Sequence, residues 1–361
     1  MTETIRVGIL GAGWAGASHA VAFSQLPHVE VAALWSRTRT TAEMLAQQLN
    51  QSRLQVYDNW QELIEQASVD VISITTPPML RREPVLAALE KDCHVLIEKP
   101  FSVGLTDAQA MIQAVSSASF VTATCFNWRY APAYQIAWRA IQEGQLGRIR
   151  DVRTEWRWRA ITRDFLVQRP WAGRMDIADG SLGEGLSHDF DKARFLTGSE
   201  FTHIISQIAS LSIKSDADFP IEGGLHMHLA KLTNGILGDF RFTVTPGEDS
   251  WEFVLSGDEG TFVINHGDAI SRQRADENDP VLLDIPEPDQ VPAGVTLIQY
   301  TWDRLVADFI QAIRQGDLAH KSVPHLPTAV DGLRCQEIIA GARISNEETR
   351  WVSLTELANI L

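Results

Sequence analysis

Residues 5–16 read IRVGILGAGWAG and decide the fold of the N-terminal half. A short apolar run over residues 7–10 breaks into three glycines, and an amphipathic segment follows over residues 17–25. A strand, a glycine-rich turn and a helix in this order predict a dinucleotide-binding site. A glycine-rich loop arising by chance would not account for the strand and the helix on either side.

The three glycines have separate tasks in such a turn. Gly11 permits the tight bend, Gly13 lets the backbone approach a pyrophosphate, and Gly16 lets the helix pack closely on its strand. The pyrophosphate then meets free N–H groups at the positive end of the helix dipole. We therefore predict cofactor contacts at the glycines and at the turn residues Trp14 and Ala15.

Composition bounds the class of protein. The 361 residues suggest two domains, and a net charge of −15 argues against nucleic acid and against an anionic membrane surface as partners. Cys93, Cys125 and Cys335 show no metal-ligand spacing and are typical of reduced cytosolic thiols. No apolar run is long enough to span a bilayer, and the first residues lead directly into the first strand, which leaves no room for a signal peptide. These features predict a cytoplasmic protein.

The end of the second predicted strand, residues 29–35, bears on the choice of cofactor. An NAD-binding unit usually places Asp or Glu about 20 residues past the glycines, on the ribose 2′-hydroxyl. Here Ser36, Arg37, Thr38 and Arg39 follow the strand, and none of them is acidic. The missing acid removes repulsion toward a 2′-phosphate, with which Arg37 and Arg39 could pair. This favours NADP, with NAD still possible. The alternative is that both arginines are solvated loop charges.

Strands and helices alternate through the first 125 residues. Apolar strands are predicted at 69–75, 94–97 and 120–126, and helices at 40–48, 60–67 (with Asp58 as N-cap), 82–90 and 106–115. The alternation predicts a doubly wound parallel sheet, a Rossmann domain over residues 1–125, whose ligands bind beyond the carboxyl ends of the strands. The segments at that edge are predicted cofactor contacts, namely Thr75, Thr76, Pro77, Glu98 and Lys99.

The second half predicts a separate α+β domain over residues 126–361. Strands are predicted at 149–158, 201–211, 224–232, 236–245, 251–255 and 260–264. Few helices interrupt them, so we expect a large, open and mostly antiparallel sheet. Residues 272–294 are acidic and proline-rich and are predicted to form a loop, and residues 305–313 a terminal amphipathic helix.

A run of motifs resembles the Gfo/Idh/MocA family of glucose–fructose oxidoreductase and inositol dehydrogenase. After the glycine turn come TPP, EKP, NWRYAP from Asn127, GQLGRI from Gly144, LGEGLSH from Leu182 with Asp191, and SGDEGT from Ser256. In effect the resemblance spans the whole chain. It implies the two-domain fold, a nicotinamide cofactor contacted also by Asn127, and a sugar or cyclitol substrate. It further implies an open sheet whose exposed face pairs subunits into a homodimer or homotetramer.

Lys99 is the first candidate catalytic residue. A dehydrogenase removes a hydride from a carbinol carbon and a proton from its hydroxyl, so it needs the nicotinamide on one side and a base on the other. An ammonium at the cofactor edge can hold the hydroxyl and stabilise a developing alkoxide. The alternative is a surface lysine. The resemblance implies that Lys99 is functional, contacts substrate as well as cofactor, and precedes a cis peptide bond to Pro100.

Glu184 and His188 are spaced i and i+4, which places both on one face of a helix, where a carboxylate can orient an imidazole. From the spacing alone, a capping or solvated pair is an equal alternative. The resemblance implies a catalytic Asp and His at these positions, contacting substrate, with Asp191 completing the motif. This sequence departs from the pattern, because Glu184 replaces the Asp and Leu186 replaces a usual Gly.

Other side chains are weaker candidates for substrate binding. We predict substrate contacts at Arg129, Trp171 and Arg174, with Trp171 stacking on a sugar face. Arg81 stands where the family often has His. Further arginines could receive an anionic substrate, although most are expected to be ordinary strand and loop charges: Arg157, Arg159, Arg163 and Arg169. His226 and His228 alternate on one strand face without an evident third ligand, so no metal site is predicted.

Together these features predict an NADP-preferring dehydrogenase or reductase that transfers a hydride to or from a sugar, sugar derivative or cyclitol. Two alternatives remain open. One is a glycoside hydrolase that uses bound NAD for transient oxidation, and the other is a non-enzymatic regulator that binds a cofactor or sugar. The intact Lys99 and His188 count against the regulator, as does the lack of an added basic DNA-binding segment.

Overall fold

The computed structural model describes residues 3–51, 53–159, 169, 171–213, 219–244, 247 and 249–357. The chain divides into two compact units. The first comprises Met1–Asn127 and Ile298–Leu333, and the second comprises Trp128–Leu297 and Arg334–Leu361. The division after Asn127 lies near the predicted boundary at residue 125. Residues 298–333, however, belong with the first unit, whereas they were predicted for the second domain.

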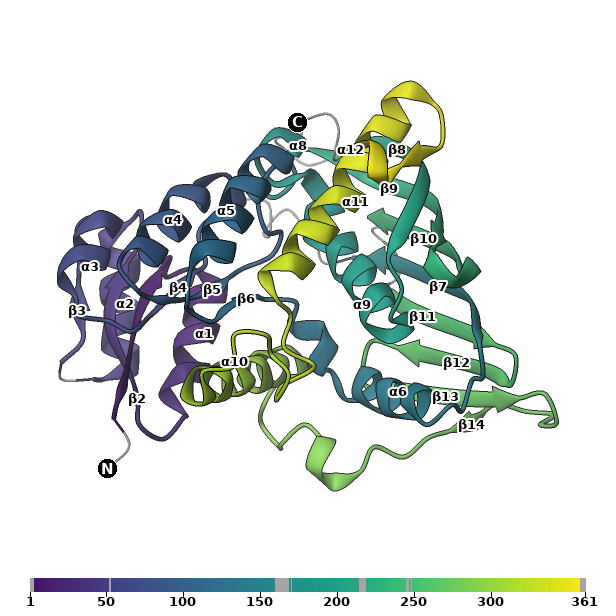
Figure 1. The fold of residues 1–361 in the computed structure, drawn as a ribbon, viewed down its shortest axis with the longest axis horizontal. Coiled ribbons are helices and arrows are strands. Elements are labelled where there is room, and N and C mark those ends of the chain that lie inside the picture. The colour runs from purple at the N-terminus through teal and green to yellow at the C-terminus, as the bar shows by residue number, and fades with distance from the viewer. Residues whose placement is uncertain are drawn as a thin grey trace. The chain divides into compact units, whose positions relative to one another are not determined.

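A six-stranded sheet forms the centre of the first unit (Figure 1). Its strands are β1 (Ile5–Leu10), β2 (Val29–Trp35), β3 (Gln55–Val56), β4 (Val71–Ile74), β5 (His94–Ile97) and β6 (Thr122–Thr124). Their order is β3-β2-β1-β4-β5-β6, and every neighbouring pair is parallel. This is the doubly wound order in which ligands bind beyond the carboxyl ends of the strands, and it confirms the predicted Rossmann sheet.

Helices cover this sheet because its strands are apolar on both faces, as in β4, where all four residues are buried. They are α1 (Trp14–Ser24), α2 (Arg39–Leu49), α3 (Trp60–Gln66), α4 (Arg82–Glu90), α5 (Leu105–Ser117) and α10 (Leu297–Gln315). The predicted N-cap at Asp58 is wrong, because Asn59 caps α3 and accepts from the backbone N–H of Glu62. Asp58 instead pairs with Arg39.

A nine-stranded sheet forms the second unit, in the order β14-β13-β12-β11-β7-β10-β9-β8-β15. The strands are β7 (Ile149–Trp158), β8 (Phe201–Ile213), β9 (Phe219–Leu232), β10 (Leu237–Val244), β11 (Ser250–Gly257), β12 (Gly260–Asn265), β13 (Ala269–Arg274), β14 (Val281–Leu282) and β15 (Val352–Ser353). Strands β7 and β10 run parallel, and the other neighbouring pairs described are antiparallel. The mostly antiparallel sheet is confirmed. The predicted loop over 272–294 is partly wrong, because β13 pairs with β12 and β14 pairs with β13, and the two strands complete the sheet edge there.

The helices of the second unit are α6 (Pro132–Gln142), α8 (Met175–Ala178), α9 (Ser187–Thr197), α11 (Ala329–Glu348) from Arg334 onward, and α12 (Leu354–Leu357). Helix α11 was not predicted, because its apolar residues are spread around it rather than gathered on one stripe. The helix predicted at 305–313 lies within α10 and is therefore not terminal. None of the described helices is long and apolar enough to cross a membrane.

Candidate active site

The glycine turn joins β1 to α1 as predicted. Gly11 has a φ of 107°, and a Cβ there would lie 2.7 Å from Thr75 Oγ1. A Cβ on Gly16 would lie 1.9 Å from the carbonyl oxygen of Gly11. A Cβ on Gly13, in contrast, would meet no atom within 4 Å. Gly11 and Gly16 thus serve close packing, whereas Gly13 leaves open space at the N-terminus of α1, where a pyrophosphate can bind.

The predicted cofactor contacts Trp14 and Asn127 are both tied to α10. Trp14 is 53% exposed and packs edge-on against Trp302, with ring centroids 4.7 Å apart. Asn127 is buried, and its Nδ2 donates to Thr301 Oγ1 at 2.6 Å. Ala15 lies in the first turn of α1. Helix α10 therefore supports the cofactor side of the first unit, although strands β7 to β14 lie between it and β6 in the sequence.

The segment after β2 carries no acidic side chain between Ser36 and Arg39. Arg37 is exposed, whereas Ser36 is half-buried. Arg39 begins α2, and its guanidinium pairs with Glu43 at 2.8 Å and with Asp58. Arg37 therefore remains the candidate partner of a 2′-phosphate, while Arg39 is held by two carboxylates.

Thr75, Thr76 and Pro77 follow β4 at the carboxyl edge. The Thr75 hydroxyl donates to the carbonyl oxygen of Gly11 at 2.8 Å and so holds the glycine turn against β4. The Thr76 hydroxyl oxygen is buried and has no hydrogen-bond partner among the residues that the structure describes. A buried hydroxyl of this kind, at the edge where ligands bind, suits a polar group of a bound dinucleotide.

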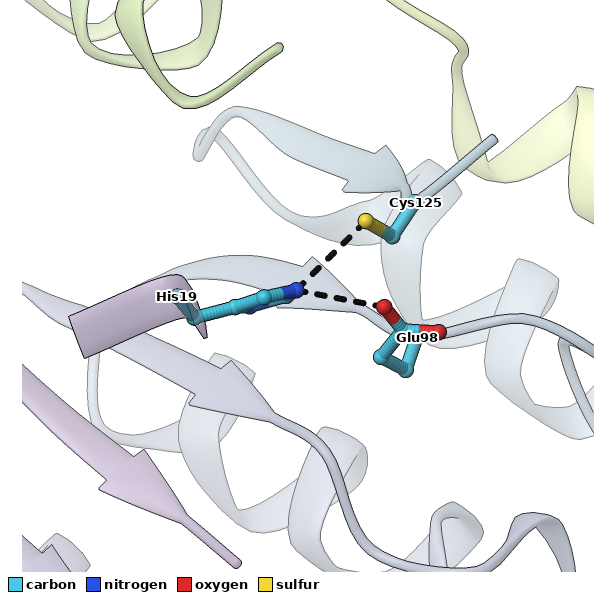
Figure 2. Close-up of side chains that lie close together, drawn as sticks. All are labelled: His19, Glu98 and Cys125. Atoms are coloured by element: carbon cyan, nitrogen blue, oxygen red, sulfur yellow. Dashed lines mark hydrogen bonds and ion pairs between the residues drawn. The ribbon is translucent and has the colours of Figure 1, made fainter. Parts of the chain in front are cut away.

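Glu98 follows β5, and His19 contacts both Glu98 and Cys125 (Figure 2). His19 projects from α1, with Nε2 3.2 Å from Glu98 Oε1 and 3.5 Å from Cys125 Sγ, while its Nδ1 lies 2.8 Å from Ser73 Oγ. Burial alone would raise the pKa of Glu98, but the hydrogen bond from His19 and nearby positive charges lower it to about 2. The ionised carboxylate can only accept, so Nε2 of His19 carries the shared proton.

These three side chains are also a possible set of metal ligands, because their ligand atoms lie within 4.8 Å of one another. They come from three distant segments, so the spacing of residues did not reveal them. The structure already provides protein partners for the cluster: Ser73 bonds His19, and the Lys99 N–H bonds Glu98. Hydrogen bonding therefore accounts for the cluster, and the absence of a metal site stays a prediction.

Lys99 is half-buried and directly follows Glu98. Its backbone N–H donates to Glu98 Oε2 at 2.9 Å, and the Lys99–Pro100 peptide bond is cis, as the resemblance implied. Strand β5 is paired with β4, with Ile97 opposite Ile74. Lys99 therefore follows β5 at the carboxyl edge of the sheet. The neighbouring strand β4 is followed by Thr75, which holds the glycine turn.

In the second unit, Glu184 and His188 lie at a junction of two helical forms. Glu184 belongs to the π-helical turn η3 (Leu182–Leu186), and His188 belongs to α9. The segment is therefore helical but not a continuous α-helix, because the π turn has i→i+5 hydrogen bonds and is wider, and the shared face of the two side chains stays a prediction. His188 is 4% exposed and lies edge-on to Trp128, with ring centroids 6.5 Å apart. Glu184 is half-buried.

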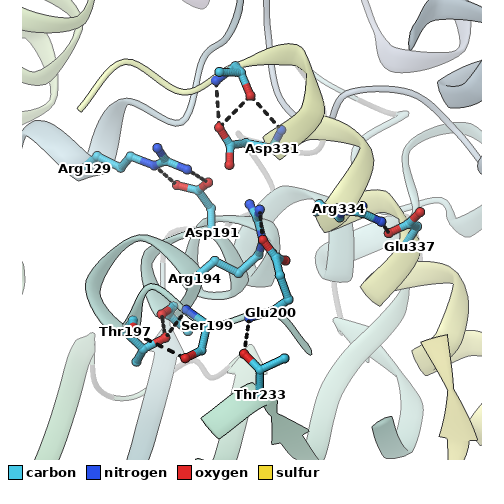
Figure 3. Close-up of polar contacts among 12 residues, drawn as sticks. Arg129, Asp191, Arg194, Thr197, Ser199, Glu200, Thr233, Asp331, Arg334 and Glu337 are labelled. Carbon is cyan, nitrogen blue, oxygen red and sulfur yellow. Dashed lines mark hydrogen bonds and ion pairs between the residues drawn. The ribbon is translucent and has the colours of Figure 1, made fainter. Parts of the chain in front are cut away.

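Arg129 forms an internal ion pair (Figure 3). Its Nε and Nη2 donate to the two carboxylate oxygens of Asp191 at 2.7 and 2.5 Å, and both side chains are buried. The guanidinium also lies 5.0 Å from the ring centroid of Phe195. A buried, bidentate pair of this kind fixes α9 to the segment that begins at Asn127. Arg129 therefore holds the His188 helix in place, and a contact of Arg129 with substrate stays a prediction.

The remaining predicted substrate contacts lie before α8. Trp171 is half-buried, and Arg174 is exposed and pairs with Asp176 through two bonds of 3.0 and 2.6 Å. This pair lowers the pKa of Asp176. Arg157 likewise pairs with Glu155 on the surface, as expected for an ordinary strand charge. Arg163 lies outside the described residues.

Helix α9 also contains a buried charge pair that was not predicted. Lys192 Nζ lies 2.7 Å from Asp189 Oδ1, donates to the Tyr134 hydroxyl at 2.9 Å and faces the Trp251 ring at 3.6 Å. Asp189 accepts from Thr154 Oγ1 and from Trp251 Nε1, both at 3.0 Å. The pair anchors α9 to β7 and β11. Charged residues in a short polar helix are usually solvated, so nothing in the local pattern indicated this burial.

His226 and His228 on β9 are both buried and stack with ring centroids 5.5 Å apart. Serine hydroxyls lie beside them, Ser181 Oγ at 2.9 Å from His226 Nε2 and Ser206 Oγ at 2.7 Å from His228 Nδ1. Burial lowers the pKa of His228 well below its usual range. Each imidazole therefore has a serine hydroxyl beside one of its ring nitrogens, and the absence of a metal site here stays a prediction.

Two family descriptions match most of the chain. Residues 5–124 match "Oxidoreductase family, NAD-binding Rossmann fold", and residues 134–263 match "GFO/IDH/MocA C-terminal domain". The chain belongs to the Gfo/Idh/MocA family. It is therefore an oxidoreductase whose first unit is an NAD-binding Rossmann domain.

Gfo/Idh/MocA proteins similar to this chain include named dehydrogenases. A levoglucosan dehydrogenase from Pseudarthrobacter phenanthrenivorans is 27% identical over 297 residues, which cover 73% of this chain and 74% of the relative. A myo-inositol 2-dehydrogenase from Thermotoga maritima is 24% identical, covering 98% of this chain and 99% of the relative. A solved levoglucosan dehydrogenase in complex with NADH and L-sorbose has the same fold, with a TM-score of 0.84 at 22% identity over 98% of this chain and 99% of that one.

Two of the three departures from the Gfo/Idh/MocA pattern lie together in the structure. Glu184 and Leu186 both lie in the π turn η3, and Leu186 is fully buried there. The third departure, Arg81, lies in the first unit between the short helix η1 (Pro78–Leu80) and α4. The changes in the second unit therefore coincide with the local widening of the helix that leads to His188.

Proposed function

We propose that this oxidoreductase transfers a hydride between a nicotinamide cofactor and a CH–OH or carbonyl group of a sugar, sugar derivative or cyclitol. The observation that carries the proposal is the position of Lys99 at the carboxyl edge of the Rossmann sheet. Lys99 follows β5, next to β4, and Thr75 after β4 bonds the glycine turn. The named relatives that act on levoglucosan and myo-inositol support the substrate class.

The bound nicotinamide supplies the hydride acceptor or donor. We assign Lys99 to holding the reacting hydroxyl and stabilising the alkoxide that develops on it. We assign His188 to removing the hydroxyl proton as a neutral imidazole, and Glu184 to orienting that imidazole. Trp171 and Arg174 remain proposed substrate contacts.

For the cofactor we propose a preference for NADP over NAD. The support is the lack of an acid after β2 together with the exposed Arg37. The solved levoglucosan dehydrogenase complex contains NADH, and the family description names NAD. A preference for NADP would therefore distinguish this chain from that relative. Ser36, Arg37 and the edge residues Thr75, Thr76 and Pro77 complete the proposed cofactor contacts.

We also propose that the second unit pairs with a copy of itself through one face of its sheet. Met227, Leu229 and Leu237 are 50%, 51% and 59% exposed on β9 and β10, and exposed apolar side chains of this kind suit association. The three buried thiols suit a reducing compartment such as the cytoplasm. Sedimentation should give a dimer or tetramer, and a monomer at micromolar concentration would contradict the pairing.

A substrate panel tests the proposed function. Cyclitols, aldoses, sugar acids and glycosides are each incubated with NAD and with NADP, and the absorbance of reduced nicotinamide is followed. We expect net cofactor reduction with at least one cyclitol or sugar. Glycoside cleavage without net reduction would favour transient oxidation instead, and the absence of turnover across a panel that nonetheless binds would favour the regulator.

A further inference from the structure

Arg81 is 2% exposed, which is rare for an arginine and calls for a partner for each of its buried donors. It stands at the start of α4, directly after η1. Its neighbour Arg82 is ordinary in comparison, with a side chain 43% exposed and contacts of 3.7 and 3.8 Å to Glu83 and Asp107. Arg81 is therefore buried by its own contacts, since the next residue in the same segment is exposed.

The guanidinium of Arg81 binds three backbone carbonyls on two different turns. Nε donates to the carbonyl oxygen of Thr76 at 2.8 Å, and Nη1 donates to those of Glu98 and Pro100. The first carbonyl belongs to the turn after β4, and the other two flank Lys99 after β5. One planar, always charged side chain thus joins the two turns at the carboxyl edge of the sheet.

The same backbone is held from its other side by Glu98. The Glu98 carboxylate accepts the Lys99 N–H at 2.9 Å and the His19 ring at 3.2 Å. Arg81 is one of the positive charges that lower the pKa of this carboxyl group. Arg81 and Glu98 therefore both bind the peptide group that joins Glu98 to Lys99, and Arg81 also binds the carbonyl oxygen of Pro100.

Two other roles for Arg81 fit the structure less well. A receptor for an anionic substrate needs free N–H groups, and three of the five N–H groups of Arg81 are directed at carbonyls. A partner for a 2′-phosphate would have to lie after β2, whereas Arg81 follows β4. A purely structural role would not require contacts near Lys99, whereas Arg81 binds the carbonyl oxygens of the residues on both sides of Lys99.

We infer that Arg81 is a positioning residue that places the Lys99 ammonium by binding the carbonyl oxygens of the two residues on either side of it, Glu98 and Pro100. The inference rests on the proposed role of Lys99 at the reacting hydroxyl. Lysine cannot replace the guanidinium, because one ammonium on a flexible stem does not reach three carbonyls in a fixed planar arrangement. Displacement of a catalytic group by about 1 Å can cost roughly 10²-fold in rate.

The first test measures how firmly Arg81 holds the backbone around Lys99 and does not depend on enzyme activity. Hydrogen–deuterium exchange of the Lys99 amide is compared in the wild type, Arg81→Lys and the matched control Arg82→Lys. We expect Arg81→Lys to speed exchange at Lys99 by about tenfold or more, and Arg82→Lys to leave it unchanged. Arg81→Gln, which keeps an N–H donor without the charge, replaces Arg81→Lys if the latter does not fold. Unchanged exchange at Lys99 would overturn the inference.

The second test asks whether Arg81 acts through Lys99. Turnover of myo-inositol or levoglucosan, whichever the wild type oxidises faster, is measured for Arg81→Lys in the wild-type and in the Lys99→Ala backgrounds. We expect kcat to fall by about 10- to 100-fold in the first background, with the cofactor Kd unchanged, and by less than about twofold in the second. Equal losses in both backgrounds would overturn the inference and leave the proposed function standing. Normal turnover in Lys99→Ala alone would overturn both.

Discussion

His19 on the first helix and Glu98 at the end of β5 form a buried pair, with Nε2 3.2 Å from Oε1. The pKa of Glu98 is about 2 against an ordinary value of 4.5. A lowered carboxyl pKa stabilises the fold above the ordinary value, and this stabilisation is lost as the pH falls toward the folded value. The shift corresponds to roughly 3 kcal/mol.

Glu98→Gln should therefore flatten the acid side of the curve of unfolding free energy against pH. We expect the wild type to lose about 3 kcal/mol more than the variant between pH 4.5 and 2, measured by urea unfolding. Glu90→Gln, an exposed carboxylate on the same unit, is the matched control and should follow the wild type. Parallel curves for the wild type and Glu98→Gln would contradict the role of the pair.

The glycines of the turn should separate folding from cofactor binding. Gly13→Ala places a Cβ in open space, so the protein should fold normally and bind NADP about tenfold or more weakly, because the methyl group takes the place of the pyrophosphate. Gly16→Ala places a Cβ 1.9 Å from a carbonyl oxygen, so it should lower stability by roughly 1–3 kcal/mol or more. Thermal unfolding measures the change in stability, and fluorescence titration measures the affinity for NADP. An unchanged affinity in Gly13→Ala would contradict the proposed pyrophosphate site.

The fold could largely be predicted because its strands are short apolar runs with turn residues between them. β2, β5 and β7 begin and end at the residues expected. The failures are elements whose stability is not local. β13 and β14 lie partly within an acidic, proline-rich segment and form by pairing, and α11 has no apolar stripe. Periodicity cannot report contacts with residues far along the chain.

Cofactor choice is the next testable feature. Arg37→Ala should weaken NADP binding by about tenfold or more and leave NAD binding unchanged, because a charge-assisted bond to the 2′-phosphate is lost. Arg39→Ala is the matched control, since Glu43 and Asp58 hold its guanidinium, and it should change the two affinities little. Isothermal titration gives both constants. Clearly tighter binding of NAD by the wild type would sink the proposed preference.

The buried pair of Lys192 and Asp189 should be a large contributor to the stability of the second unit. Lys192→Met leaves Asp189 buried and uncompensated, so it should cost roughly 3–5 kcal/mol in denaturant unfolding. The double change with Asp189→Asn should cost less than the sum of the single changes. Lys231→Met removes a surface lysine 5.1 Å from the Trp351 ring and is the control. Additive losses would show that the two side chains do not act as a pair.

The candidate site was only partly open to prediction. Gly13, Lys99 and His188 belong to short motifs whose residue types indicate their chemistry. His19 and Arg81 support the Lys99 motif from other segments, and Lys192, on the same helix as His188, bonds Tyr134 and faces Trp251, so only the fold brings these side chains to their partners. Arg129 was predicted to contact substrate, which stays a prediction, but its ion pair with Asp191 could be found only in the structure.

Hydride transfer by Lys99→Ala, measured together with cofactor binding in the same preparation, tests the central claim most directly. The account predicts an NADP affinity close to that of the wild type and a turnover lower by about 10²- to 10⁴-fold, because the loss of one acid–base group removes transition-state stabilisation and not the dinucleotide site. His188→Ala should behave alike and should also flatten the acidic side of the pH profile of oxidation, because a base must be unprotonated to accept the hydroxyl proton. Near-normal turnover in Lys99→Ala, with NADP still bound, would contradict the account.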